Sequence, residues 1–351
     1  MPPIASQPVE AALTANALFL TLTLHDGEEA LQTFRDLCAD LPSLLRAVGF
    51  RNAQAELSCV LGVGAALWDR LGMGARPKGL HPFVEIRGAR HAPATPGDIL
   101  LHIRAARPDF CFEMARQILL RLEPVATLED ETQGFKFFDN RDLLGFVDGT
   151  ENPTGADRAR AVLIGAEDAP FRGSSYVIVQ KYMHDLHAWE AMTVEAQERV
   201  IGRRKLSDIE FPDAEKASYA HNVLTNITDD AGEQLQILRD NMPFGSPTKG
   251  GSGTYFIGYA CEPGRIETML RNMFVGDPPG NHDRILDVST AITGGLFFVP
   301  HQGVIELIGK GRQVAPSGND AAPPPSTPLL QTNAPTASPH RAVNPNDRKS
   351  F

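Results

Sequence analysis

Three short segments of the sequence contain side chains that could transfer protons or bind a cofactor. The segment GFVDGTENP places one carboxylate, Asp148, between a short apolar run and a glycine turn. The segment EKASYAHNVLTNI places His221 among apolar residues at helical spacing, and QILRDNMPFG places Arg239 and Asn241 before a glycine-rich turn. An Asp-Gly turn, a core histidine and an arginine at the end of an element are each common in proteins. No single segment therefore identifies a function.

Other histidines are weaker candidates. His184 and His187 stand three residues apart near a predicted helix start, a spacing that can bind a metal. They lack the acidic residue of a His-Glu-x-x-His pattern, which favours surface or capping roles. His282 follows Pro-Gly-Asn and is expected to be exposed in a turn.

Composition excludes several classes of protein. The chain of 351 residues has a formal net charge of −10 and a pI near 5.5, which argues against a nucleic-acid-binding surface. No apolar run approaches the ~18 residues of a membrane-spanning helix, and the N-terminus lacks the basic region of a signal peptide, so we expect a cytoplasmic protein. The scattered cysteines form no Cys-x-x-Cys pair, which disfavours a zinc ribbon, an iron–sulfur site and covalently attached haem.

Hydrophobic periodicity predicts two similar halves. In the first half, residues 17–27 alternate as in a strand, residues 28–49 have helical spacing, residues 55–64 read as a strand, and residues 98–122 read as a strand followed by a helix. The second half repeats the order of strand and helix in residues 174–205 and 253–276. These patterns predict an α+β protein with two ferredoxin-like domains, each an antiparallel sheet with helices on one face.

The predicted organisation has four parts. Residues 1–135 form an N-terminal ferredoxin-like domain and residues 176–312 a C-terminal one. Between them, residues 136–175 form an ordered loop that carries Asp148, because the phenylalanines of this region need burial. Residues 313–351 are rich in Pro, Ala and Ser and are expected to be disordered.

Five motifs together resemble a known family. GFVDGTENP, IGRRK, SYAHNV, LRDNMPFG and TYFIGYA follow one another in the order found in dye-decolourising peroxidases. The resemblance covers roughly residues 15 to 310, and the short loops are similar to those of the bacterial class B and P branches. It implies two ferredoxin-like domains with one haem b per chain, bound in the C-terminal domain.

The resemblance implies roles for individual residues. His221 matches the iron ligand, Asp148 the distal acid–base residue, Arg239 the distal arginine, and Asn241 a polar residue of the distal pocket. A carboxylate can carry a proton between the two oxygens of peroxide, and an arginine can stabilise the charge that develops on them. Because arginine also favours an ionised neighbour and burial a neutral one, the direction of any shift at Asp148 stays open.

Less specific matches extend the predicted site. Arg203 of IGRRK corresponds to a haem-propionate contact, and Asp287 is the candidate carboxylate behind the proximal histidine. Trp189, Tyr182 and Tyr219 are aromatic residues that could relay electrons from bulky substrates, although core packing is the commoner role of such residues.

The implied function is that of a haem-dependent peroxidase. It would use hydrogen peroxide to form a ferryl intermediate and then oxidise dyes, phenolics or similar one-electron donors. Two alternatives remain open: a haem-binding, iron-releasing protein similar to a deferrochelatase, and a peroxidase held as cargo in a protein nanocompartment through its C-terminal tail. A homo-oligomer is expected, and neither nucleic acid nor a membrane is an expected partner. The sequence leaves the physiological reductant open.

Overall fold

A computed structural model describes residues 4–248 and 251–315 of the chain. Residues 316–351, which make up most of the tail predicted to be disordered, lie outside the described part. Within that part, no helix has the length and apolar character needed to cross a membrane.

The first half of the chain forms an antiparallel sheet in the order β2-β5-β1-β6. The apolar and polar alternation of NALFLTLTL produces β1, which pairs with β5 on one side and β6 on the other. The strands are β1 (Asn16–Leu24), β2 (Ser58–Val63), β5 (Ile99–Ala105) and β6 (Ala126–Phe135). The helices and short elements are α1 (Glu28–Gly49), the 3-10 helix η1 (Ala53–Ala55), α2 (Ala65–Arg70), the strand pair β3 (Ile86–Arg87) and β4 (His91–Ala92), and α3 (Pro108–Leu122).

The second half forms a sheet in the order β12-β7-β10-β9, extended by the short β8 and β11. The strands are β7 (Ser175–His184), β8 (Leu238–Arg239), β9 (Met242–Gly245), β10 (Ser252–Ala260), β11 (Ser289–Ala291) and β12 (Gly295–Val299). The helices are α4 (Gly155–Val162), η2 (Ala166–Phe171), α5 (Leu186–Glu190), α6 (Val194–Ile201), α7 (His221–Leu224), α8 (Gly264–Phe274), η3 (Arg284–Asp287) and α9 (Gln302–Gly309). Both sheets have the strand order of a ferredoxin-like unit, which confirms the predicted fold class.

The two sheets join at both edges, a feature that the sequence does not reveal. Val63 of β2 pairs with Phe298 of β12, and Gly134 of β6 pairs with Phe244 of β9. Because β7 pairs with both β10 and β12, the hydrogen bonding runs round a closed ring, β7-β12-β2-β5-β1-β6-β9-β10. The ring gives each strand an inner and an outer face.

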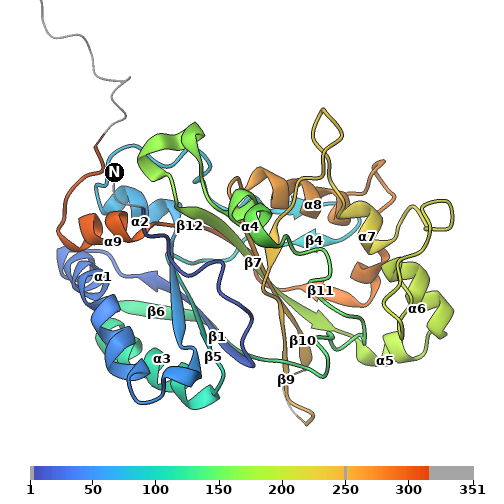
Figure 1. Cartoon of the computed structure of the whole chain (residues 1–351), viewed down its shortest axis with the longest axis horizontal. Helices are drawn as coiled ribbons and strands as arrows, with labels where there is room; N and C mark the ends of the chain where they lie inside the picture. The colour runs from blue at the N-terminus through green and yellow to red at the C-terminus, as the bar shows by residue number, and fades with distance from the viewer. Residues whose placement is uncertain (1–3, 249–250, 316–351) are drawn as a thin grey trace, which may run out of the picture. The chain divides into compact units, whose positions relative to one another are not determined.

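Each face of the ring has its own hydrophobic core. In β1, Leu18 and Leu20 face outward and pack in the core that includes Phe34 of α1 and Met114 of α3, while Phe19 faces the interior. Figure 1 shows α1 and α3 beside β1, β5 and β6, with α8 beside the strands of the second half. Residues on both faces of these strands are therefore buried.

The connection between the halves is more regular than predicted. Residues 136–175 contain α4 and η2 besides irregular chain. The acidic segment just before them is also structured: β6 runs to Phe135, although most of its side chains are exposed or half-buried. The three boundaries between the four predicted parts remain predictions.

Candidate haem site

His221 and a buried aspartate form one part of the candidate site. His221 is the first residue of α7, and its Nδ1 lies 2.7 Å from Oδ2 of Asp283. Asp283 is fully buried, and its other oxygen accepts a hydrogen bond from the backbone N–H of Ile285 at 3.0 Å. Because an ionised carboxylate can only accept, Nδ1 of His221 carries the proton and Nε2 bears a free lone pair. This arrangement is the one that a metal-ligating histidine needs.

The prediction that Asp287 is the carboxylate behind His221 is wrong. Asp287 accepts hydrogen bonds from Arg90 at 2.5 Å, from Arg284 at 3.1 Å and from His282 at 3.1 Å. Both aspartates belong to the same turn. Asp283 caps the start of η3 and points back to His221, whereas Asp287, at the end of η3, is held by the two arginines.

Asp148 and Asn241 are joined directly. Nδ2 of Asn241 donates to Oδ2 of Asp148 at 3.0 Å, and Oδ1 of Asn241 accepts from the backbone N–H of Ile257 at 3.0 Å. The bond to Ile257 fixes which end of the amide faces Asp148, so that a donor always points at the carboxylate. Asn241 therefore positions Asp148 as a hydrogen-bond acceptor.

Arg239 is held through its backbone by a residue of the Asp148 motif. Asn152 accepts from the backbone N–H of Arg239 at 2.9 Å and donates to the backbone C=O of Arg239 at 2.8 Å. The turn that carries Asn152 begins at Gly149, whose φ of 79° favours glycine. The sequence GFVDGTENP thus supplies the carboxylate and also the clamp that places Arg239.

These residues meet at one cavity. Asp148, His221, Arg239 and Asn241 all line it, together with apolar side chains from α6, α8 and β10. The apolar lining consists of Phe146, Val147, Ile201, Ile237, Phe256, Ile266, Met269, Leu270, Met273 and Ile285. The structure thus brings the predicted ligand and the predicted distal residues to a common, mostly apolar space.

Two further titratable residues line this cavity, and sequence reasoning missed both. His184, predicted to lie at the surface, is half-buried between two hydroxyls: Nε2 lies 2.9 Å from Thr254 Oγ1 and Nδ1 2.8 Å from Ser289 Oγ. Burial lowers the pKa of His184 to about 4. It therefore stays neutral near pH 7, and with both nitrogens engaged it is a poor iron ligand. The spacing of His184 and His187 in the sequence did not indicate that His184 lines the cavity.

Asp142 is the second of these residues. Burial raises the pKa of its carboxyl to about 7, and the neighbouring Asp148 adds to the rise, while the backbone N–H of Phe146 opposes it. Asp142 thus adds a group to the cavity that is largely protonated at acidic pH.

Replacing Asp142 with asparagine should change how stability depends on pH. An aspartate whose folded pKa is raised is stabilised in its protonated form, so its favourable contribution is complete below the unfolded pKa of ~3.9 and is lost as pH rises through about 7. We expect wild type to lose stability relative to Asp142→Asn over this window, by on the order of a few kcal/mol. Urea unfolding at pH 5 and pH 8 measures the difference. Equal pH profiles for both proteins would contradict it.

A second prediction concerns the partner of His221. Asp283→Asn removes the anion behind the imidazole and should lower haem affinity by ~10–100-fold, the usual loss for an outer-shell partner. Asp287→Asn is the matched control, because Asp287 belongs to the same turn but contacts only Arg90, Arg284 and His282 within the described residues. Haem titration of both variants tests the assignment, which is wrong if Asp287→Asn has the larger effect.

The remaining predicted residues lie in different settings. Arg203 forms ion pairs with Glu151 at 3.2 Å, Asp208 at 3.1 Å and Glu210 at 3.4 Å. Among the described residues, Arg203 is not part of the cavity lining. Its role at a propionate stays a prediction.

The three predicted relay aromatics differ in burial and contacts. Tyr182 lines the cavity and donates to Gln180 at 2.7 Å, and Trp189 is buried with its N–H on Leu144 C=O at 2.9 Å. The guanidinium of Arg284 lies over the ring of Tyr219, 5.7 Å from its centroid. These contacts are those of packed aromatic residues, and none of them tests a role in electron transfer.

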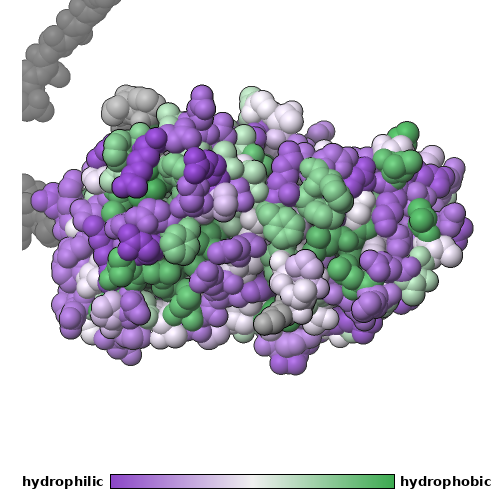
Figure 2. All heavy atoms as spheres, turned by 90° about the horizontal axis from the view of Figure 1, so that it is seen from below, coloured by the Kyte–Doolittle hydropathy of each residue, from purple (hydrophilic) through white to green (hydrophobic). Residues whose placement is uncertain are grey.

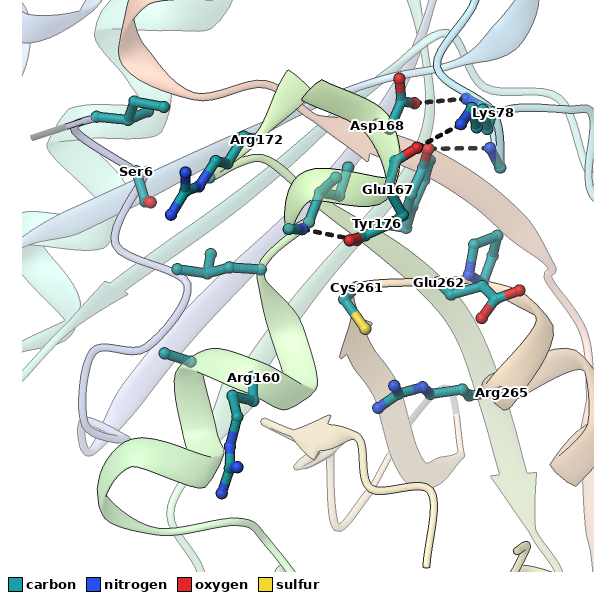
Figure 3. A pocket seen from close by; sticks show the side chains of 18 residues that line it. Ser6, Lys78, Arg160, Glu167, Asp168, Arg172, Tyr176, Cys261, Glu262 and Arg265 are labelled. Carbon is teal, nitrogen blue, oxygen red and sulfur yellow. Dashed lines mark hydrogen bonds between the residues drawn. The ribbon is translucent and has the colours of Figure 1, made fainter. Parts of the chain in front are cut away.

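A second cavity, of about 1150 Å³, is lined by other residues than those predicted for the site. Figure 3 shows Tyr176 and Cys261 at this cavity among side chains of both charges: Lys78, Arg160, Arg172 and Arg265, and Glu167, Asp168 and Glu262. Within residues 4–248 and 251–315, none of the predicted site residues lines it.

Known proteins match the chain over most of its length. Models of the N-terminal and C-terminal parts of Dyp-type peroxidases match residues 6–136 and 139–304. A dye-decolorizing peroxidase of Mycolicibacterium paratuberculosis is 54% identical over 92% of this chain and 90% of its own length.

Two solved structures are similar throughout. A variant of DypB from Rhodococcus jostii RHA1, solved in complex with heme, is 54% identical with a TM-score of 0.84, and the match covers 86% of this chain and 98% of that one. The encapsulated DyP-type peroxidase of Mycobacterium smegmatis is 51% identical with a TM-score of 0.84, covering 89% of this chain and 100% of that one. The chain belongs to the Dyp-type, or dye-decolourising, peroxidase family.

Proposed function

We propose that the protein is a haem-dependent peroxidase that uses hydrogen peroxide to oxidise dyes, phenolics or similar one-electron donors. One observation carries the proposal: the His221–Asp283 pair and the Asp148–Asn241 pair, with Arg239, line the same apolar cavity. A ligand histidine with an anionic partner and a distal carboxylate beside an arginine are the groups that peroxide activation at a haem requires.

The residues present fit a haem b. The apolar walls suit the porphyrin faces, and Nε2 of His221 is the nitrogen left for the iron. Nε of Arg239 is buried and, within the described residues, has no hydrogen-bond partner. Bound haem would supply the iron that reacts with hydrogen peroxide and passes its oxidising power to a reductant.

The chain's own residues supply the proton transfers and the charge. Asp148 is placed to take the proton that peroxide must lose and to return it to the departing oxygen. Asn241 keeps that carboxylate facing the cavity, and Arg239 adds a permanent positive charge that stabilises the negative charge on the oxygens. Asp283 holds the imidazole of His221 in the tautomer that binds iron.

Arg203 is our candidate for a contact with a haem propionate. Its guanidinium pairs with Glu151 and Glu210, whose side chains are 46% and 39% exposed, and arginine binds carboxylates well. A propionate would take the place of one of these exposed partners.

The experiment that tests the function compares peroxide turnover with iron release. Purified protein should be red-brown, should show a Soret band that shifts on adding one equivalent of peroxide, and should oxidise an azo dye or a phenol. Asp148→Asn keeps the shape of the side chain, since an amide oxygen can still accept from Asn241, but it cannot take up a proton. It should slow the peroxide reaction by ~10²-fold or more. Iron release without peroxide and no dye oxidation would favour the deferrochelatase-like alternative.

Partner proteins form a further part of the proposal. One relative is described as encapsulated, and we propose that this chain is likewise cargo of a shell protein, bound through residues 313–351. Co-purification with the shell protein should disappear when these residues are deleted, and binding that survives the deletion would contradict the role of the tail.

We also propose a homo-oligomer. Figure 2 shows apolar areas among polar ones on one face, and Phe138, Leu206 and Ile209 are 76%, 90% and 66% exposed. Exposed apolar groups of this size are common at protein interfaces. Sedimentation of the wild type and of Leu206→Asp tests this, and a monomeric wild type would contradict it.

A further inference from the structure

A tyrosine and a histidine form a buried polar pair inside the strand ring. The hydroxyl of Tyr259 in β10 lies 2.8 Å from Nδ1 of His102 in β5. Both residues are completely buried, and they are 157 positions apart in the chain. Apolar residues of both sheets, among them Val60 and Leu100, fill the interior around Tyr259.

Tyr259 stands on β10, a strand that forms part of the wall of the haem cavity. Side chains alternate along β10, so Thr254 and Phe256 line the cavity while Tyr255 and Tyr259 face the ring interior. The residue beside Tyr259, Gly258, pairs with Arg239, the distal arginine. One layer of backbone thus separates the cavity from the tyrosine.

The imidazole of His102 is set to accept the phenolic proton. The phenol is the stronger acid of the two groups, so we assign the hydroxyl of Tyr259 as donor and Nδ1 of His102 as acceptor. Burial, together with the nearby Arg104, lowers the pKa of His102 well below its ordinary value, so the ring is neutral before oxidation. This makes it a weak base, but a tyrosine that has lost an electron is acidic enough to protonate it. Burial raises the pKa of Tyr259, so the phenol stays protonated until it loses an electron.

We propose that Tyr259 and His102 form a redox pair in which Tyr259 gives one electron to the peroxide-oxidised haem while its phenolic proton moves to Nδ1 of His102. The inference rests on the proposed peroxidase function, which supplies the oxidant. The balance is complete: haem gains one electron and retains one of its two oxidising equivalents, the O–H bond of Tyr259 breaks, and an N–H bond forms on His102. The products are a neutral tyrosyl radical and an imidazolium.

A second tyrosine on the same strand provides the contrast. Tyr255 is as deeply buried as Tyr259 and stacks on Phe19 at 4.0 Å, and Phe19 stacks in turn on His102 at 4.8 Å. The hydrogen-bonding neighbour of the Tyr255 hydroxyl is Thr21, an alcohol and not a base. Oxidation of Tyr255 would therefore leave the proton on the oxidised phenol, which is a far stronger acid than an imidazolium, because Thr21 offers no base to take it.

The test uses the holoenzyme mixed with one equivalent of peroxide and no reductant. Rapid-freeze electron paramagnetic resonance detects the radical, protein grown with ring-deuterated tyrosine assigns it, and the Soret band monitors oxidation of the haem separately. The variants are Tyr259→Phe, which removes the hydroxyl, His102→Phe, which removes the base but keeps a ring on Phe19, and Tyr255→Phe as the matched control.

We expect a tyrosyl radical in wild type and in Tyr255→Phe and its loss in Tyr259→Phe. The first Soret change on mixing with peroxide should be the same in all three, and only in Tyr259→Phe should the haem then keep both oxidising equivalents. In His102→Phe the radical should form roughly 10²-fold more slowly, because the base is missing. An undiminished tyrosyl signal in Tyr259→Phe would overturn the assignment. So would equal loss in Tyr259→Phe and Tyr255→Phe, the result expected if the residues only pack the core.

An independent measurement needs no peroxide. Nitrogen-15 NMR of labelled holoenzyme should show His102 with an unprotonated Nδ1 and a protonated Nε2, and Tyr259→Phe should shift the Nδ1 resonance. A protonated Nδ1 in wild type would remove the base and overturn the proposal. A wild-type Soret band that does not respond to peroxide would instead overturn the peroxidase function, and the role of the pair with it.

Discussion

Replacing Asp240 with alanine should lower the free energy of unfolding by about 3–5 kcal/mol, because it leaves the charge of Arg104 buried without its partner. The two side chains are completely buried and 2.5 Å apart inside the strand ring. Arg104 also donates to the backbone carbonyls of Pro8 and Ala11. These hydrogen bonds hold its side chain in the interior, away from water. Urea unfolding of wild type and variant measures the loss.

The same substitution should slow the reaction with peroxide. Asp240 lies between Arg239 and Asn241, which face the cavity, while its own side chain faces the opposite side of the sheet. The ion pair with Arg104 therefore holds the segment that carries Arg239 and Asn241. Stopped-flow mixing with peroxide should show a slower Soret change in Asp240→Ala even at temperatures where the protein is folded.

Asp109→Ala is the matched control for stability. Asp109 also pairs with an arginine, Arg107, at 2.7 Å, but both side chains are more than half exposed. We expect a loss of ~0–1 kcal/mol, as for other surface pairs. Arg104→Met combined with Asp240→Leu should recover part of the loss, since no charge remains buried, although the carbonyls of Pro8 and Ala11 lose their donor. Similar losses in Asp240→Ala and Asp109→Ala would contradict the role of burial.

The resemblance to a known family predicted four polar residues of the cavity but not how they are held. The motifs that resemble the family contain Asp148, Asn241, Arg239 and His221. All four residues line the same cavity in the structure. The partner of His221 was misassigned because sequence spacing does not tell which acid of a short turn points inward. Asp283, and not Asp287, is the residue that caps the first turn of η3.

The interior of the ring was not predicted, for a different reason. Periodicity identified β5 as a strand, but it gives no reason to bury His102 and Arg104, because such residues are seldom fully buried. Only the closure of the ring covers that face, and it depends on pairings such as Val63 with Phe298. The partner of Arg104 is 136 positions away, beyond the range of any local pattern.

Replacing His221 with alanine should remove the haem or leave it loosely bound. His221 is the cavity residue whose Nδ1 is fixed by an anion, Asp283, so that Nε2 is left to bind iron. The loss of affinity should exceed the ~10–100-fold that loss of an outer-shell partner costs, because the bond to iron itself is lost. Haem titration followed by the Soret band, together with the haem-to-protein ratio after gel filtration, measures it.

His184→Ala provides the matched control, because it removes another histidine from the same cavity. Both nitrogens of His184 are engaged, by Thr254 and Ser289, and the low pKa of about 4 keeps the ring neutral. We expect His184→Ala to retain a full complement of haem and the Soret band of wild type. Added imidazole should restore the Soret band in His221→Ala, since the vacated space can hold a free ring. Loss of haem from His184→Ala with retention by His221→Ala would show that the two histidines have exchanged roles, and that the carboxylate of Asp283 serves the fold and not the iron.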